Sequence, residues 1–166
     1  MDVIRSFKPV SDQAARTLVL GSMPGVRSLQ ASRYYAHPRN AFWPIMAKIL
    51  NVNEESPYET RVQSLLTARI ALWDVLHACV RNGSLDSAIQ TGSRVPNDFA
   101  SFFNRHPDIK LVCFNGTEAE RSFKAYALPK LNIKGIKYVR LPSTSPAHAV
   151  SFDKKLAVWR AALGAR

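Results

Sequence analysis

The 166-residue sequence has few cysteines and no residue cluster that would hold a metal. Cys79 and Cys113 are its two cysteines, and neither belongs to a C-x-x-C pair or a His/Cys cluster. This spacing argues against zinc and iron–sulfur sites, so we expect no metal and no cofactor. Cys113 lies in an apolar run, where a reduced thiol packs as a small core side chain. A reduced core thiol favours a cytoplasmic protein over a secreted one.

Long apolar stretches, repeats and linkers are missing as well. The first ten residues alternate charge with isolated apolar side chains, which predicts neither a signal peptide nor a membrane span. No Pro/Gly/Ser-rich segment is long enough to divide the chain, and 46% apolar content is enough for a hydrophobic core. We therefore expect one domain over residues 1–166, a monomer that does not bind membranes.

Acidic residues are scarce relative to basic ones. The sequence has 12 Asp and Glu against 23 Lys and Arg, which gives a net charge of +11 and a predicted pI near 10.1. A polyanionic partner is favoured by this imbalance, and nucleic acid is the first candidate. The alternative is a charge spread evenly over the surface that only keeps the protein soluble.

Four short apolar runs alternate with helix-like stretches. The runs, which predict buried strands, lie at 17–20, 70–75, 110–114 and 136–141. The helix-like stretches between them include 41–50, 58–68, 97–105 and 117–126. This alternation predicts an α/β fold with a parallel sheet, in which each strand is reached by a helical crossover.

A further helix is predicted near the C-terminus. Ser151 is suited to cap it, and Asp153 falls in its first turn. Four large apolar residues recur on one face of this helix: Phe152, Leu156, Trp159 and Leu163. We expect that face to pack over the last strand.

Distinctive motifs follow the predicted strands. G-S-M-P-G (21–25) follows the first, N-G (115–116) the third and P-S-T-S-P-A-H-A (142–149) the fourth. Because ligands bind at the carboxyl ends of parallel strands, these motifs should meet in one cleft. The segment Y-Y-A-H-P-R-N-A-F-W (34–43) combines aromatic, cationic and amide side chains. That mixture suits a flat polar base beside phosphates, so we predict that this segment forms the floor of the active site.

The motifs G-S-M-P-G, A-H-P-R-N-A-F-W, F-N-G and P-S-T-S-P-A-H-A resemble, in this order, those of the uracil-DNA glycosylase superfamily. The segment 34–43, together with W-D-V-L-H-A-C-V-R-N-G-S-L-D-S-A-I (73–89), looks most like the hypoxanthine-DNA (deoxyinosine) glycosylase branch. The resemblance implies a three-layer αβα sandwich around a central, mainly parallel four-stranded sheet. It also implies a base-flipping enzyme that hydrolyses the N-glycosidic bond of deaminated bases and leaves an abasic site. Mismatch-specific uracil glycosylases are the closest rival.

Two positions depart from the wider family pattern. Met23 stands where several branches place a water-orienting Asn or Asp, and a thioether cannot hold that water. The resemblance to the hypoxanthine branch implies that Asn40, in the H-P-R-N motif, has this duty and is the catalytic residue. Leu141 stands where other branches carry a His or Asn that helps the base to leave, and His148 could compensate for its absence.

A carboxamide mechanism restricts the substrate. Breaking the glycosidic bond builds negative charge on the departing base, and Asn40 can accept a hydrogen bond from water but cannot take its proton. Deaminated bases such as hypoxanthine, uracil and xanthine leave as stabilised anions and fit this restriction. The structural alternative for Asn40 is a cap of the helix-like stretch 41–50, because Asn is favoured at helix N-termini.

Several residues are expected to contact the base. Asn115 presents a donor and an acceptor together, which matches the adjacent C=O and N–H of hypoxanthine or uracil, provided that neighbours fix its orientation. Its alternative role is a turn residue before a glycine. By resemblance, Tyr35 stacks on the extruded base, while Tyr34 only braces the loop; a half-buried core position is the alternative for either ring. The turn after the first strand would also line the base site, with Gly21, Ser22 and Met23.

DNA contacts are predicted for the loop after the fourth strand. Ser143, Ser145 and the backbone amides around 146–149 can hold phosphate ahead of a helix, and the alternative is an ordinary capped turn. The residues that we expect to contact DNA are Arg39, Pro142, Ser143, Ser145, Pro146 and His148. The partner would be DNA that contains deaminated bases.

Two other classes of function remain open on the sequence. A DNA-binding relative that has lost catalysis is suggested by Met23 and Leu141, which replace reactive or polar groups. A phosphoester-binding or nucleotide-binding α/β protein is a third hypothesis, although the 21–25 turn lacks both G-x-G-x-x-G and a P-loop lysine.

Overall fold

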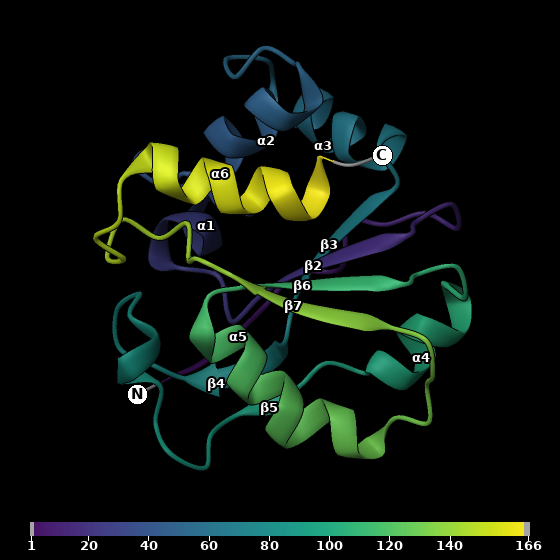
Figure 1. Cartoon of the computed structure of the whole chain (residues 1–166). Coiled ribbons are helices and arrows are strands. Elements are labelled where there is room, and N and C mark those ends of the chain that lie inside the picture. Colours follow the sequence, from purple (N-terminus) through teal and green to yellow (C-terminus); the bar gives the residue numbers. More distant parts are fainter. Residues whose placement is uncertain (1, 165–166) are drawn as a thin grey trace.

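A parallel sheet of four strands forms the centre of the molecule, in a computed structural model that describes residues 2–164 (Figure 1). The strands lie in the order β3 (Ile70–Asp74), β2 (Thr17–Gly21), β6 (Leu111–Asn115) and β7 (Lys137–Leu141). All three neighbouring pairs are parallel, which confirms the predicted sheet. The predicted bounds of each strand differ from the observed ones by one residue at one or both ends.

One face of the sheet is covered by helices alone. The helices of this layer are α2 (Phe42–Leu50), α3 (Tyr58–Thr67) and α6 (Phe152–Leu163), and Figure 1 shows them above the sheet. Val19 and Cys113 point into this layer from neighbouring strands and pack with Phe42 and Trp159. Because strand residues alternate between faces, the adjacent apolar residues belong to the opposite layer.

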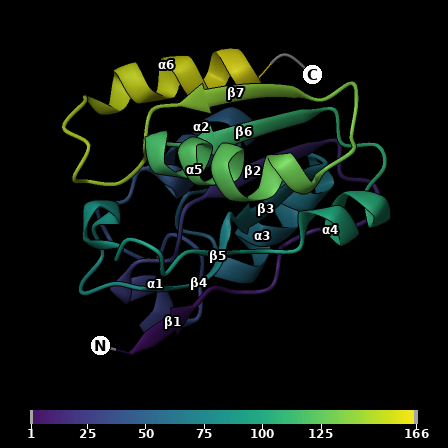
Figure 2. The ribbon, with the colours of Figure 1, turned by 90° about the horizontal axis from the view of Figure 1, so that it is seen from below.

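The opposite face is covered by a mixed layer, which Figure 2 shows in front of the sheet. It contains α4 (Phe99–Arg105), α5 (Thr117–Ser122) and a three-stranded antiparallel sheet in the order β1 (Val3–Arg5), β4 (Leu76–Val80) and β5 (Val95–Pro96). A π-helical segment (Phe123–Ala127) and a 3-10 turn (Leu128–Lys130) continue α5. Together the three layers confirm the expected αβα architecture.

The sequence prediction missed this second sheet for a physical reason. β1 and β5 are only three and two residues long, which is too short for a periodic signal. Val75 alone separates β3 from β4, so the predicted strand 70–75 ended at this junction and the strand that follows was not recognised. The expected helical crossover therefore joins the strands of the parallel sheet but does not separate β3 from β4.

Helix ends follow local capping chemistry. The predicted helix at 97–105 begins at Phe99, because the Asp98 side chain accepts the Ser101 backbone N–H. Ser151 caps α6 as predicted and accepts the Lys154 N–H. α6 packs against β7, also as predicted.

The expected apolar face of α6 is only partly buried. Trp159 and Leu163 are fully buried and Leu156 is half-buried, but Phe152 is 37% exposed because it lies in the first turn, beyond the end of β7. α1 (Val26–Ala31), which the sequence analysis did not predict, lies beside the end of β2. No helix within residues 2–164 combines the length and apolar character that a membrane crossing requires.

Trp159 should be a main source of stability, because it is fully buried and its indole Nε1–H donates to the Pro142 carbonyl at 2.9 Å. We expect Trp159→Ala to lower the free energy of unfolding by about 3–5 kcal/mol in urea denaturation. Val158→Ala, at the neighbouring position that is 46% exposed, should change it by less than about 0.5 kcal/mol. Equal effects of the two substitutions would contradict this packing.

Candidate active site

The carboxyl ends of β2, β3 and β6 bring three functional groups to one edge of the sheet. These strands end at Gly21, Asp74 and Asn115. Gly21 pairs in register with Asp74, and Asn115 pairs with Leu141 on the other side of β6. Both views show the loop that joins β7 to α6 at this same edge (Figures 1 and 2). The motifs that follow the strands therefore converge, as the sequence predicts.

The Asn115 side chain is held by Thr144. Asn115 Oδ1 accepts the Thr144 backbone N–H at 2.9 Å, and Asn115 Nδ2 donates to Thr144 Oγ1 at 2.9 Å. A backbone N–H can only donate, so it fixes which end of the amide is oxygen. Both side chains are buried, with exposures of 9% and 1%. The amide keeps one N–H and one lone pair that this pair of bonds does not use.

The loop after α1 places two tyrosines differently. Tyr34 is buried, its hydroxyl donates to the Lys8 carbonyl, and its own carbonyl accepts the Trp43 indole N–H. Tyr35 has a positive φ of 54°, an uncommon conformation for a bulky residue. Its ring stacks on Phe42 with centroids 4.2 Å apart, so one ring face is already covered. Tyr34 braces the loop, and the Tyr35 hydroxyl is directed inward.

Above Gly21, the Asp74 carboxyl and the Tyr35 hydroxyl approach the same point. A Cβ added to Gly21 would stand 2.5 Å from Asp74 Oδ1 and 3.0 Å from the Tyr35 hydroxyl. Among the described residues, neither Tyr35 Oη nor Asp74 Oδ2 has a hydrogen-bond partner, although both atoms are buried. Only glycine fits at position 21 beneath these two groups.

Burial controls the ionisation of this pair. Burial, and after it the Asp86 charge, raise the pKa of the Asp74 carboxyl to about 7 against the lowering effect of the Arg81 charge. Burial also raises the pKa of the Tyr35 phenol, with a further increase from Asp74 and a decrease from the nearby Asn115 amide. Near neutral pH the Tyr35 phenol is therefore protonated, and the Asp74 carboxyl is protonated in about half of the molecules.

Asn40 lies where the loop meets α2. Its Oδ1 accepts the Phe42 N–H at 2.9 Å, so the amide has a capping contact, as in the structural alternative. The next residue, Ala41, donates its N–H to the Thr144 carbonyl and joins this loop to the one after β7. Asn40 is half-buried and lines a pocket of about 320 Å³ with residues of the same loop and of α2 and α3. Its oxygen retains a second lone pair that the bond to Phe42 does not use.

The turn after β2 is held by the segment that follows β4. Ser22 Oγ donates to Asp86 Oδ1 at 2.7 Å, and the buried Arg81 donates from Nη2 to the Pro24 carbonyl. Ser84 Oγ accepts the Val26 N–H at 2.9 Å. These groups belong to the 73–89 stretch that distinguishes the branch in sequence. Met23, in contrast, is 6% exposed and packs with the apolar side chains of the core.

In the loop after β7, serine hydroxyls accept hydrogen bonds from backbone N–H groups of the same loop. Ser143 Oγ accepts the Ser145 N–H, and Ser145 Oγ accepts the Ala147 N–H, both at 3.2 Å. Lys155, only 4% exposed, donates from Nζ to the Ser145 carbonyl, and burial lowers its pKa. A buried ammonium thus lies behind the loop expected to hold phosphate.

The remaining predicted DNA-contacting residues lie outside this hydrogen-bonded cluster. Pro142 accepts the Trp159 indole N–H through its carbonyl. Pro146, His148 and Arg39 are exposed, at positions that can meet a partner in solution. The Arg39 N–H donates to His37 Nδ1, so His37 fixes the loop locally.

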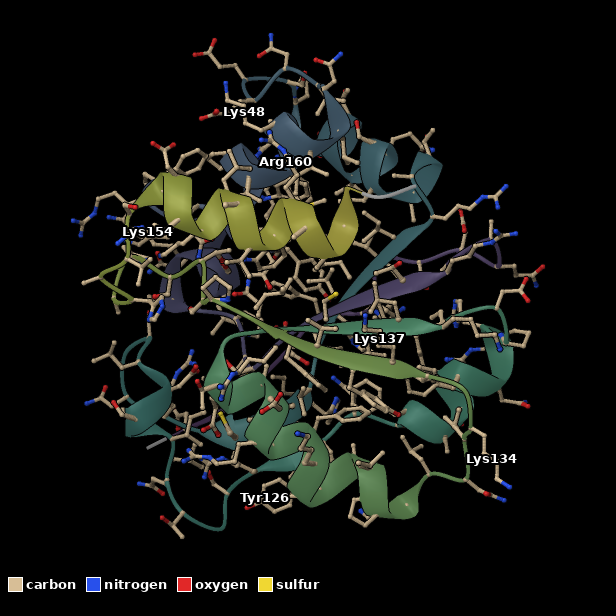
Figure 3. The ribbon with its side chains drawn as sticks, in the orientation of Figure 1. Lys48, Tyr126, Lys134, Lys137, Lys154 and Arg160 are labelled. Carbon is tan, nitrogen blue, oxygen red and sulfur yellow. The ribbon has the colours of Figure 1, made fainter. Side chains whose placement is uncertain are left out.

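Positive charge is distributed over several sides of the molecule. Figure 3 shows Lys48, Lys154 and Arg160 in the helix-only layer, whereas Lys134 and Lys137 lie along the other side. Net charge therefore does not identify one face as the binding surface. The loops at the strand ends identify the candidate site. Within residues 2–164 no group of three or more His, Cys, Asp or Glu side chains could hold a metal ion.

Sequence analysis overlooked several residues that organise the site: Asp74, Arg81, Asp86, Thr144 and Lys155. Asp74 could have been found by the rule that was applied to Asn115, because it is the first polar residue at the end of an apolar strand. The other four act through contacts between distant segments, and no local pattern announces them.

Comparisons with known proteins identify the family of the chain. The family model described as the uracil DNA glycosylase superfamily matches residues 7–163. The chain is 35% identical over 158 residues to a hypoxanthine DNA glycosylase of Methanosarcina acetivorans, covering 95% of this chain and 96% of the relative. It is 33% identical over 156 residues to a hypoxanthine DNA glycosylase of Methanosarcina barkeri, covering 93% and 94%.

A solved structure extends the comparison to the fold. The solution NMR structure of a proposed uracil DNA glycosylase from Methanosarcina acetivorans superposes with a TM-score of 0.82, at 32% identity and with 98% of each chain covered. Fold, motif order and full-length similarity therefore lead to the same conclusion: the chain belongs to the uracil DNA glycosylase superfamily.

Proposed function

We propose that this DNA glycosylase removes hypoxanthine from deoxyinosine in DNA and leaves an abasic site. The observation that carries the proposal is the fixed Asn115 amide, which lies near the Tyr35 hydroxyl at the strand ends. Two relatives that match nearly the whole chain carry the name hypoxanthine DNA glycosylase, which supports this choice of base.

Asn115 supplies base selection in this proposal. Hypoxanthine presents a C=O acceptor beside an N–H donor. Both bonds to Thr144 use the edge on which the amide oxygen and N–H lie side by side, so the remaining N–H or lone pair meets one of these two groups from a fixed direction. Adenine presents the reversed pattern on the same edge, so a fixed amide rejects it. Thr144 enforces this selectivity, because its backbone N–H prevents the Asn115 amide from flipping.

Asn40 positions the attacking water. Its Oδ1 has a second lone pair beside the capping bond to Phe42, and this lone pair can accept a hydrogen bond from water below the sugar carbon. The capping bond then has a catalytic use, because it fixes the direction of the carbonyl. Such a mechanism acts on bases that leave as stabilised anions.

DNA is held by the loop after β7 and by nearby cations. The Ser143 and Ser145 oxygens accept backbone N–H groups, which leaves their O–H groups to donate to phosphate. The buried Lys155 ammonium adds positive charge directly behind this loop. The exposed residues Arg39, Pro146 and His148 complete the contact surface.

A mismatch-specific uracil glycosylase is the second candidate, because uracil presents the same adjacent C=O and N–H to Asn115. Duplexes that carry inosine, uracil or xanthine, followed by alkaline cleavage of abasic sites, rank these substrates. We expect inosine to be cleaved fastest. An absence of cleavage with all three would contradict a glycosylase and favour a relative that only binds DNA.

Asn40 should be essential for the chemical step beyond its capping contact. We expect Asn40→Ala to lower the single-turnover rate on inosine DNA by about 100-fold or more, a typical loss for a single electrostatic or positioning group. The matched control is Asn40→Ser, whose hydroxyl can still accept the Phe42 N–H but cannot reach the water. The Asn40→Ser variant should be as stable as the parent protein, while its activity should stay as low as that of Asn40→Ala. If Asn40→Ser retained activity, capping of α2 would be the only role left for Asn40.

Arg39 should contribute a phosphate contact rather than a base contact. We expect Arg39→Ala to weaken binding to undamaged and damaged duplexes alike, and to reduce the slope of log affinity against log salt by about 1. Fluorescence anisotropy between roughly 50 and 200 mM salt measures both quantities. Arg105, at the end of α4 and distant from the strand-end loops in sequence, offers the matched Arg→Ala control. An unchanged slope in Arg39→Ala would show that Arg39 does not contact a DNA phosphate.

A further inference from the structure

Asp74 is a buried titratable group for which the proposed function has no role. It ends β3 beside Gly21, its exposure is 4%, and its Oδ2 has no hydrogen-bond partner among the described residues. The Tyr35 hydroxyl, also buried and without a partner, lies over the same glycine. A buried polar atom left unpaired costs stability, so two of them on side chains that meet over one glycine require an explanation, which a bound hydrogen-bonding ligand would supply.

We propose that Asp74, in its neutral form, and Tyr35 donate two hydrogen bonds to the departing base and stabilise the negative charge that develops on it. This inference rests on the proposed glycosylase function and assigns its leaving-group step. Asn115, near the Tyr35 hydroxyl, reads the edge of the same base. The three side chains come from the ends of β3 and β6 and from the loop after α1.

The surroundings of Asp74 keep its carboxyl neutral. The titratable and charged groups that act on it are Asp86 and Arg81 from the segment after β4, and Tyr34 and Tyr35 from the loop after α1. Arg81 donates to the Pro24 and Gly83 carbonyls and forms an ion pair with Asp86 at 3.9 Å, while its Nη1 has no hydrogen-bond partner among the described residues. Burial and Asp86 outweigh Arg81, so the pKa of Asp74 rises to about 7.

The chemistry balances with these groups. The bond between C1′ and the base nitrogen breaks, and its electron pair stays on the base. The oxygen of the water held by Asn40 forms the new bond to C1′ and releases a proton to solvent. Asp74 gives its proton to an acceptor atom of the base and regains one from solvent, while Tyr35 donates a hydrogen bond throughout. A general acid works best when its pKa lies near the working pH, and Asp74 meets this condition.

The proposed role of Asp74 also substitutes for a leaving-group contact that the apolar Leu141 cannot make. Leu141 is 1% exposed and ends β7, where other branches carry a polar residue that helps the base to leave. β7 is an edge strand of the parallel sheet, and β3, with Asp74, is the other edge. The leaving-group duty would then have moved across the sheet, from the end of β7 to the end of β3.

The pH dependence of single-turnover cleavage of inosine DNA tests this assignment. The neutral carboxyl is the active form, so the rate should hold a plateau below pH 7 and fall as the pH rises above it. Asp74→Asn keeps a donor but cannot titrate; we expect a rate about 10- to 100-fold lower at pH 6, with no decline between pH 6 and 8.5. Tyr35→Phe should lower the rate at least tenfold and keep the decline. A parent rate that rises through pH 7, or an Asp74→Asn variant that keeps the decline, would overturn the proposal.

Asp86→Asn provides a sharper version of the same test. Removing the Asp86 charge lowers the pKa of Asp74, because that charge raises it. The decline in rate should therefore begin at a lower pH. Asp98→Asn, a substitution of the exposed cap of α4, should leave the position of the decline unchanged. A decline that stays in place in Asp86→Asn would show that another group titrates.

Thermal stability separates a functional carboxyl from a structural one. Asp74 binds its proton more tightly in the folded state, so the cost of burying its charge grows as the pH rises from about 4 through 7. We expect Asp74→Asn to raise Tm at pH 8 by several degrees and to change it little at pH 5. A lower Tm at both pH values would mean that Asp74 holds the fold, against the proposal. Cleavage of inosine DNA by the parent tests the proposed function separately, whatever the variants do.

Discussion

The reciprocal hydrogen bonds between Asn115 and Thr144 are the constraint on which the site depends. They join the end of β6 to the loop after β7, and Thr144 extends the connection by accepting the Ala41 N–H with its carbonyl. Three segments far apart in sequence are thereby set in one arrangement. Each polar group of Thr144 has a partner, which is what a residue that is 1% exposed requires. A loop held in this way can present its hydroxyls outward without losing its shape.

At this same edge of the sheet, the end of β3 is held differently. There Asp74 and Tyr35 are buried without full hydrogen bonding, and Tyr35 adopts a left-handed backbone conformation. Proteins retain such unfavourable features where the surrounding structure enforces them, and functional sites are where they gather. The network of Arg81, Asp86 and Ser22 supplies that enforcement by holding the turn after β2. Stability at the Thr144 loop and strain at the Asp74 edge are thus complementary parts of one site.

The sequence predicted the parallel sheet well because its strands are buried on both faces and therefore appear as continuous apolar runs. It also predicted that Asn115 and the 142–149 loop would meet, since both follow parallel strands. The sequence could not predict how Asn115 would be held, because its partner lies 29 residues away. Asp74 was missed although it ends a strand, since the apolar residues that follow it hid the boundary between β3 and β4. Local patterns find elements, whereas the pairing of distant polar groups is visible only in three dimensions.

The two amides and the neutral acid form a consistent chemical set. Neither Asn40 nor Asn115 can remove a proton, and Asp74 in its proposed neutral form cannot act as a base, so the proposed mechanism generates no hydroxide. In this mechanism the barrier is lowered by stabilising the leaving base, through hydrogen-bond donors directed at the negative charge that it acquires. Such donors gain strength in a buried setting, where Asp74 is 4% exposed and the Tyr35 oxygen is fully covered. Adenine and cytosine leave as poorer anions than the deaminated bases do, so the proposed arrangement would favour removal of a deaminated base over removal of adenine.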